Sequence, residues 1–316
     1  MKANVNVNVT VTPRHARLSR REAALAMSGL ALASANRVEA GGTPAAPRRV
    51  RRLFVDGEWG QIHARMARPE GRVRHPPIVC LHQTPLSSRM FASVLGELAV
   101  DRVAIAIDTP GYGESEPPPG PPEIADYARV LLAAVRLISS TRDSDSIDIL
   151  GYHTGTIMGV EIARQQPAAV RRLVLSSMPV FDPARRAELL KSFEPDPITE
   201  DGAHILKPWK SGVAGRGPGQ TMEMTHRNYT EKLRADPEKS YWALRALARY
   251  AIEDALPRLR QPILLLQSKD TLYEHAAKAK QLQPNAIIVE RIDLGNGLFD
   301  VDPKGTAAAV LSFLNA

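Results

Sequence analysis

The side chain with the strongest sequence signal for chemistry is His153, in the stretch Gly151-Tyr152-His153-Thr154-Gly155. This spacing of glycines has the frame of a nucleophile elbow, a sharp turn from a strand into a helix whose middle residue is normally serine. The glycines let the backbone crowd together at the turn, so the middle side chain is pushed into the site. We therefore predict that His153 faces a substrate.

The residues on both sides of this turn support the interpretation. Residues 146–150 are rich in β-branched side chains and predict a short strand. Residues 156–166 keep apolar side chains at helical spacing, and Pro167 ends that segment. The alternative is a glycine-bracketed loop with an ordinary polar histidine, and the order of strand, turn and helix favours the elbow.

A histidine at this position supports different chemistry from a serine. An imidazole has an ordinary pKa of about 6.5, so it is largely neutral and nucleophilic at pH 7 without a separate base. His153 could act as a general base on water or on a carbon acid, or it could attack a carbonyl and form a transient acyl-imidazole. We favour the general base, because acyl-imidazoles are labile.

The elements around His153 alternate between strands and helices, which is typical of a mostly parallel, doubly wound sheet with helices on both faces. Residues 179–256 carry no strand pattern, and an inserted, mainly helical lid is more economical there than a long structureless loop. A hairpin is expected to turn at Asp56-Gly57. The predicted strands are 53–55, 62–66, 77–81, 103–107, 146–150, 172–176, 262–266 and 286–289, and the main predicted helices are 88–98, 124–137, 156–166 and 306–314.

Four motifs follow one another in the order of a known family. They are His82-x-x-Pro85, Asp-x-x-Gly-x-Gly-x-Ser from Asp108 to Ser115, the elbow, and the turn Gln267-Ser268-Lys269-Asp270. Over residues 50–316 the chain resembles the α/β-hydrolase superfamily, in the branch of lid-bearing epoxide hydrolases, dehalogenases and small esterases. The resemblance implies an α/β-hydrolase fold, with a core of residues 51–178 and 257–316 and a helical lid of residues 179–256.

The resemblance also assigns roles, and this sequence departs from two of them. Asp270 takes the place of the family's catalytic acid. Asn296 stands where the family has histidine, after Gly295 and seven residues before Pro303, and a register that places Leu298 there fits less well. Asp270, Asn296 or both would then hold the ring of His153.

Further site residues are implied by the same resemblance. The backbone N–H groups of Thr84 and Thr154 would form an oxyanion hole. His82, Gln83 and Tyr152 would lie at the substrate pocket, with His82 bracing its loop and Gln83 in place of the usual glycine.

The composition limits the class of protein. The chain has 316 residues, 44% of them hydrophobic and 24% charged, which is ordinary for a globular protein. Its net charge is +7, but residues 1–35 alone carry +4, so no nucleic-acid partner is expected. The single cysteine, Cys80, lies in an apolar run and is expected to pack, and no residue spacing indicates a metal or cofactor site.

Residues 1–35 resemble a twin-arginine signal peptide. Ser19-Arg20-Arg21 precedes an alanine-rich apolar run, and Ala33-Ser34-Ala35 offers a cleavage site. The run is too short for a stable membrane anchor. We therefore predict recognition by the export machinery, a linker over residues 36–50, and a periplasmic or secreted enzyme, the alternative being an amphipathic or disordered extension.

The predicted function is cofactor-free hydrolysis of a small, partly apolar ester, lactone or related carbonyl compound. The enzymatic alternative is a lyase, isomerase or decarboxylase that uses His153 as a base. The non-enzymatic alternative is a ligand-binding protein that has lost catalysis. A fold does not decide between these reactions.

Overall fold

The computed structural model describes residues 48–139, 146–195 and 198–316. The predicted signal peptide, residues 1–35, and most of the predicted linker lie outside the described residues, so export stays a prediction.

One sheet carries the fold, with its strands in the order β1-β2-β4-β3-β5-β6-β7-β8. The pairs β1/β2 and β2/β4 are antiparallel and the other five pairs are parallel, which confirms the predicted, mostly parallel sheet. The strands are β1 (Arg51–Gly57), β2 (Gly60–Ala67), β3 (Ile78–Leu81), β4 (Ala104–Ile107), β5 (Ile147–Tyr152), β6 (Val170–Ser176), β7 (Ile263–Ser268) and β8 (Ile287–Arg291).

The opening hairpin turns two residues later than predicted. Asp56 pairs with Gln61 and Gly57 with Gly60, so residues 58 and 59 make the turn and the predicted turn at Asp56-Gly57 is wrong. Gly60 has a φ of 103°, a backbone angle that glycine adopts without steric cost. The glycine whose backbone angle allows the turn is therefore Gly60, which follows the turn, and not Gly57, which precedes it.

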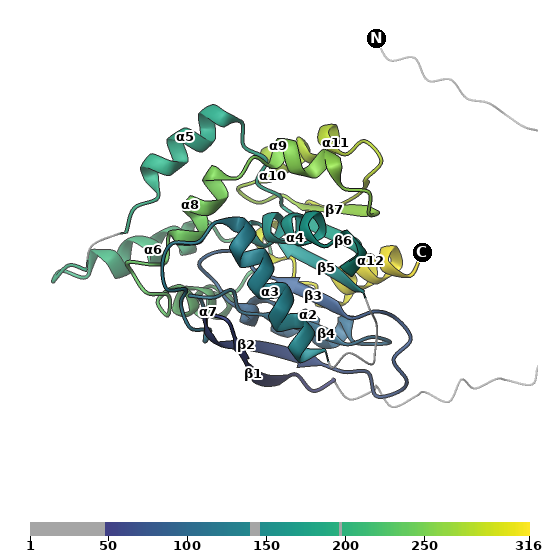
Figure 1. Cartoon of the computed structure of the whole chain (residues 1–316). Helices are drawn as coiled ribbons and strands as arrows, with labels where there is room; N and C mark the ends of the chain where they lie inside the picture. The colour runs from purple at the N-terminus through teal and green to yellow at the C-terminus, as the bar shows by residue number, and fades with distance from the viewer. Residues whose placement is uncertain (1–47, 140–145, 196–197) are drawn as a thin grey trace, which may run out of the picture. The chain divides into compact units, whose positions relative to one another are not determined.

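Two hydrophobic cores lie on the two faces of the sheet. Along β3, Ile78 and Cys80 belong to one core and Val79 and Leu81 to the other, as the alternation of a strand requires. Helices α2 (Ala92–Leu98) and α12 (Pro303–Asn315) cover the first face, and α3 (Ile124–Ile138) and α4 (Thr154–Gln165) cover the second (Figure 1). Burial raises the pKa of the Cys80 thiol, which agrees with a packing role.

Between β6 and β7 the described chain is helical and contains no strand. Most of its helices extend to one side of the sheet, where α5 and α8 pack together, while the last of them, α9, lies against α4 (Figure 1). They are α5 (Pro183–Ser192), α6 (Ala203–Ala214), α7 (Met222–Lys232), α8 (Trp242–Arg249) and α9 (Ile252–Ala255). The 3₁₀ turn η3 (Leu256–Arg258) ends this segment, and the shorter elements elsewhere are α10 (Tyr273–Ala277), α11 (Ala279–Leu282) and the 3₁₀ turns η1 (Ser88–Phe91), η2 (Pro167–Ala169) and η4 (Gly295–Gly297).

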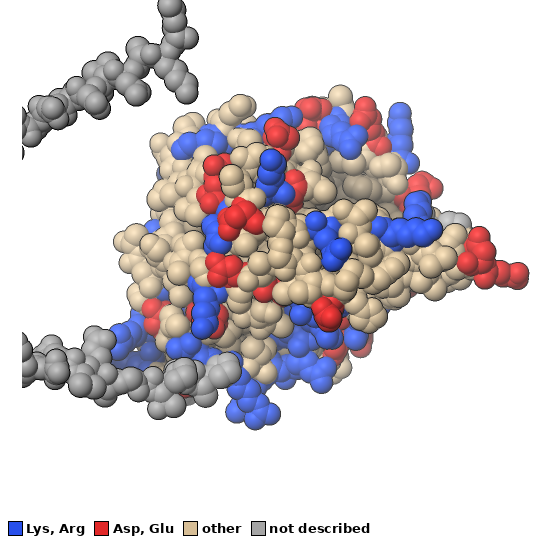
Figure 2. Space-filling model, turned by 180° about the vertical axis from the view of Figure 1, so that it is seen from behind, with Lys and Arg blue, Asp and Glu red and all other residues tan. Residues whose placement is uncertain are grey.

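The surface carries charges of both signs. Figure 2 shows acidic and basic side chains interspersed over the upper part of one face and mainly basic side chains along its lower edge. In the part of the chain that the structure describes, no helix combines the length and apolar character that crossing a membrane requires.

Candidate active site

The turn at His153 joins the end of β5 directly to the start of α4. His153 has φ 48° and ψ −117°, a region that non-glycine residues rarely occupy and that costs about 1–3 kcal/mol. A Cβ atom added to Gly151 would lie 2.6 Å from the carbonyl oxygen of Gly155, and one added to Gly155 would lie 2.0 Å from that of Leu81. Both glycines are therefore required by close backbone approach, as the elbow interpretation predicts.

The ring of His153 is held by a buried carboxylate. Its Nε2 lies 2.9 Å from Oδ2 of Asp270, and the hydroxyl of Tyr152 donates to the same oxygen at 3.0 Å. The other carboxylate oxygen accepts the N–H of Leu272 at 2.9 Å. The sequence left open whether Asp270, Asn296 or both hold the ring, and the observed partner is Asp270.

Asp270 is suited to stay ionised. Burial alone would raise its pKa, but the hydrogen bond and the charge of His153 and the N–H of Leu272 together lower it below the ordinary value. An ionised carboxylate only accepts hydrogen bonds, so Nε2 of His153 is the donor. In the neutral ring the lone pair is then on Nδ1, the nitrogen available for proton transfer or attack.

The two predicted oxyanion-hole residues are neighbours. The N–H of Thr84 points at Oγ1 of Thr154 across 3.5 Å, a long and weak contact. Thr154 is the first residue of α4, and the first N–H groups of a helix have no partner within it. The N–H of Thr84 therefore lies beside Thr154, the residue that follows His153, and the oxyanion hole stays a prediction.

Asn296 lines the same cavity as His153, and among the described residues no hydrogen bond joins its side chain to the imidazole. It sits in the short turn η4, and its amide nitrogen donates to the carbonyl oxygen of Gly215 at 2.9 Å, at the end of α6. The predicted role of Asn296 in holding the ring of His153 is therefore corrected: its short side chain is engaged with the helical segment instead.

The comparison with protein families decides the identity of the fold. A model of the alpha/beta hydrolase family matches residues 78–309, well over half of the chain. The chain belongs to this family. The predicted α/β-hydrolase fold is thereby confirmed, and the chain is a member of a family of hydrolases.

Relatives of this α/β-hydrolase are distant. The human serine hydrolase-like protein is 28% identical over 138 residues, which is 43% of this chain and 65% of the relative, so the match spans slightly less than two thirds of that protein. The 2-(acetamidomethylene)succinate hydrolase of Mesorhizobium japonicum is 23% identical over 76% of this chain and 88% of its own length. The solved structure of the enol-lactonase from Burkholderia xenovorans shares the fold, with a TM-score of 0.67 at 18% identity, covering 84% of this chain and 100% of the lactonase.

A cavity of about 310 Å³ opens above His153 in this α/β-hydrolase. Core residues form its floor and the helical segment forms its other walls. Of the three residues predicted to line the substrate pocket, only Gln83 does so. The lining consists of Gln83, Leu86, His153, Thr271 and Asn296 from the core and Pro208, Ser211, Gly212, Gly215, Gln220, Thr225, Asn228, Tyr229 and Lys232 from the helical segment.

His82 and Tyr152 lie below the cavity, so their placement in the pocket lining is corrected. The ring of Tyr152 is buried against Phe299, with ring centroids 5.3 Å apart, because Tyr152 is the last residue of a central strand. His82 accepts the N–H of Thr109 on Nε2 at 2.9 Å, so its Nδ1 carries the proton and donates to the carbonyl oxygen of Gln83 at 2.9 Å. Burial lowers the pKa of His82, which suits the predicted bracing role.

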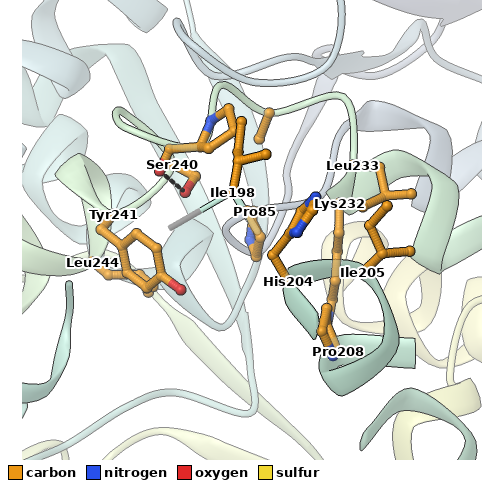
Figure 3. A pocket seen from close by; sticks show the side chains of 12 residues that line it. Pro85, Ile198, His204, Ile205, Pro208, Lys232, Leu233, Ser240, Tyr241 and Leu244 are labelled. Carbon is orange, nitrogen blue, oxygen red and sulfur yellow. Dashed lines mark hydrogen bonds between the residues drawn. The ribbon is translucent and has the colours of Figure 1, made fainter. Parts of the chain in front are cut away.

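A second cavity of about 500 Å³ adjoins the first and is more apolar. Tyr241 and Leu244 lie on one side of it, and His204, Lys232 and Pro208 lie on the other (Figure 3). Pro208 and Lys232 also line the cavity above His153, so they separate the two spaces. These residues could not be assigned to a cavity from the sequence, because the helical segment carries no motif that determines which of its side chains face inward.

A metal site is not evident. Within the described ranges, no three histidine, cysteine or acidic side chains come close enough together to hold a metal ion.

Proposed function

We propose that this α/β-hydrolase hydrolyses an ester or lactone with a His153–Asp270 pair in place of a serine-based triad. The observation that carries the proposal is the imidazole itself, presented on the strained turn, held at 2.9 Å by a buried carboxylate and exposed to a cavity. A carboxylate that fixes the ring and stabilises its protonated form is how triads orient a histidine base.

In the proposed reaction a water molecule attacks the substrate carbonyl carbon while Nδ1 of His153 takes one of its protons. The carbonyl electron pair moves to oxygen, where the N–H groups of Thr84 and Thr154 stabilise the negative charge. Collapse of the tetrahedral intermediate breaks the bond to the leaving alkoxide, which receives the proton from Nδ1. Asp270 keeps its charge throughout and stabilises the imidazolium.

Two further facts support hydrolysis of a carbonyl compound. A relative named 2-(acetamidomethylene)succinate hydrolase and a structural neighbour named enol-lactonase belong to this fold. The helical segment and the core together line the cavity at His153, which supports the proposal that residues 179–256 form a lid. A lid over the cavity would limit the access of bulk water to the reacting carbonyl.

The decisive experiment replaces His153 by alanine. With 4-nitrophenyl acetate as substrate, we expect kcat/KM to fall by a factor of about 10² to 10⁴, the usual contribution of a positioned general base. Asn296→Ala is the matched control in the same cavity, and it should keep most of the activity because its amide contacts Gly215 rather than the ring. Equal turnover by the His153→Ala variant and the wild type would refute the proposal.

Pre-steady-state kinetics separate the two roles of the imidazole. A general base predicts no burst of 4-nitrophenolate and a normal solvent deuterium isotope effect. A burst that matches the enzyme concentration would show attack by His153 on the carbonyl and an acyl-imidazole intermediate.

A further inference from the structure

The wall between the two cavities carries an amine without an acidic partner. Lys232, the last residue of α7, lines both spaces. No carboxylate in the described ranges forms an ion pair with it, although its neighbour Glu231 bonds Ser87 and lies 3.6 Å from Arg89. Lys232 is half-buried, and burial lowers its pKa, as expected for an amine that has lost water without gaining a counter-ion.

The two cavities are also free of negative charge. The titratable side chains on their described linings are those of His153, His204, Lys232, Tyr229 and Tyr241, and no aspartate or glutamate is among them. Asp270 lies behind the ring of His153 and is fully buried. A ligand that fills either space therefore meets one ammonium group and no competing carboxylate.

We propose that Lys232 determines specificity by binding a carboxylate of the substrate, while the reacting carbonyl lies at His153. The inference rests on the proposed function and deepens it: the substrate is an ester or lactone that also carries a carboxylate. A neutral donor on the same wall, the side-chain amide of Asn228, can complete the carboxylate's hydrogen bonds. The apolar second cavity, with Leu233, Tyr241 and Leu244, would accept the remaining apolar part (Figure 3).

The test compares two esters that differ only in this charge. Mono-4-nitrophenyl glutarate and 4-nitrophenyl pentanoate have five-carbon acyl chains, which end in a carboxylate and a methyl group respectively. For Lys232→Met, we expect kcat/KM to fall about tenfold to a hundredfold for the glutarate ester, the range for a lost hydrogen bond to a charged group. The pentanoate ester should stay within about a factor of two to three.

Two further variants control for charge and for folding. Lys210→Met removes an exposed cation from α6 that lines neither cavity, so it should leave both esters unchanged. Lys232→Arg keeps the charge and should retain most of the preference for the glutarate ester. Equal losses for both esters in Lys232→Met, or no loss for the glutarate ester, would overturn the inference.

Binding measured without turnover separates this inference from the proposed function. In the His153→Ala variant, calorimetry should detect glutarate, and adding Lys232→Met should weaken its binding about tenfold or more. If the wild type hydrolyses neither ester but binds glutarate through Lys232, the proposed hydrolysis fails and the carboxylate site stands. If glutarate binding does not depend on Lys232, the carboxylate site is wrong.

Discussion

Two of the histidine–aspartate pairs among the described residues have almost the same contact distance and different surroundings. His63 Nδ1 lies 2.8 Å from Asp108, and both side chains are at most 1% exposed. His153 Nε2 lies 2.9 Å from Asp270, and its side chain is 16% exposed and lines a cavity. The contact distance therefore does not distinguish the proposed reactive pair from the structural one, and the proposal depends on the access of His153 to the cavity.

The buried pair, His63 and Asp108, is brought together by the pairing of two strands of the sheet. The antiparallel register of β2 and β4 pairs Ala64 with Ile107, so His63 and Asp108 are the next residues to meet. Asp108 also accepts the N–H groups of Ser88 and Glu114, at 2.6 and 2.9 Å. Nε2 of His63 is buried and has no partner among the described residues, so this ring has no route to a substrate.

The largest expected effect is the loss of activity when the His153–Asp270 pair is broken. Asp270→Asn removes the charge that stabilises the imidazolium of His153, and we expect kcat/KM for a 4-nitrophenyl ester to fall by about 10² to 10⁴. Because folding lowers the pKa of Asp270, its charge also stabilises the fold, and the activity is therefore measured well below the melting temperature of the variant. Asp108→Asn is the paired control, and it should lower stability and leave the activity of the folded molecules intact. A drop in activity confined to Asp108→Asn would reverse the assignment of the two pairs.

Breaking the buried His63–Asp108 pair should lower the free energy of unfolding. His63→Ala leaves a cavity and removes a donor from a buried carboxylate, which together cost about 2–4 kcal/mol in the free energy of unfolding. Urea denaturation measures this loss. His75→Ala is the control, because His75 and Asp101 form a pair at 3.4 Å that is 32% and 20% exposed, and it should cost about 1 kcal/mol or less. Similar losses in the two variants would show that burial does not distinguish these pairs.

Acid should weaken the buried pair within a defined pH window. Burial would raise the pKa of Asp108, but the hydrogen bond of His63, the charge of His82 and the N–H groups of Ser88 and Glu114 lower it from 3.8 to about 2. A pKa lowered by folding stabilises the protein above the unfolded value, and the stabilisation is lost as the pH falls from about 4 toward 2. The difference corresponds to about 2 kcal/mol. Urea midpoints between pH 6 and pH 2.5 should fall less in Asp108→Asn than in the wild type, and parallel curves would contradict the assignment.

The sequence predicts the scaffold better than the site. Apolar runs such as residues 77–81 and 262–266 predict buried strands because a parallel sheet covered on both faces needs them. Gly151 and Gly155 predict the elbow because only glycine fits the close backbone contacts there. Asp270 follows β7, so a position beside the elbow at the same edge of the sheet could be expected.

The direction of individual side chains was harder to predict. Asn296 turns to Gly215 because the end of α6 lies next to η4, a tertiary contact that no local pattern encodes. Lys232 faces the cavities because of how α6 and α7 pack. The His63–Asp108 pair depends on β2 lying beside β4, and the order of strands in a sheet is not written in the spacing of either residue.

The backbone at residue 153 is fixed by its neighbours and not by its own side chain. Gly151, Gly155 and the end of β3 determine the angles of the turn, so a different residue at 153 would be presented in the same place and direction. Exchanging one reactive group for another thus requires no rebuilding of the surrounding framework. The turn can therefore present different side chains at position 153, and in this chain it presents an imidazole.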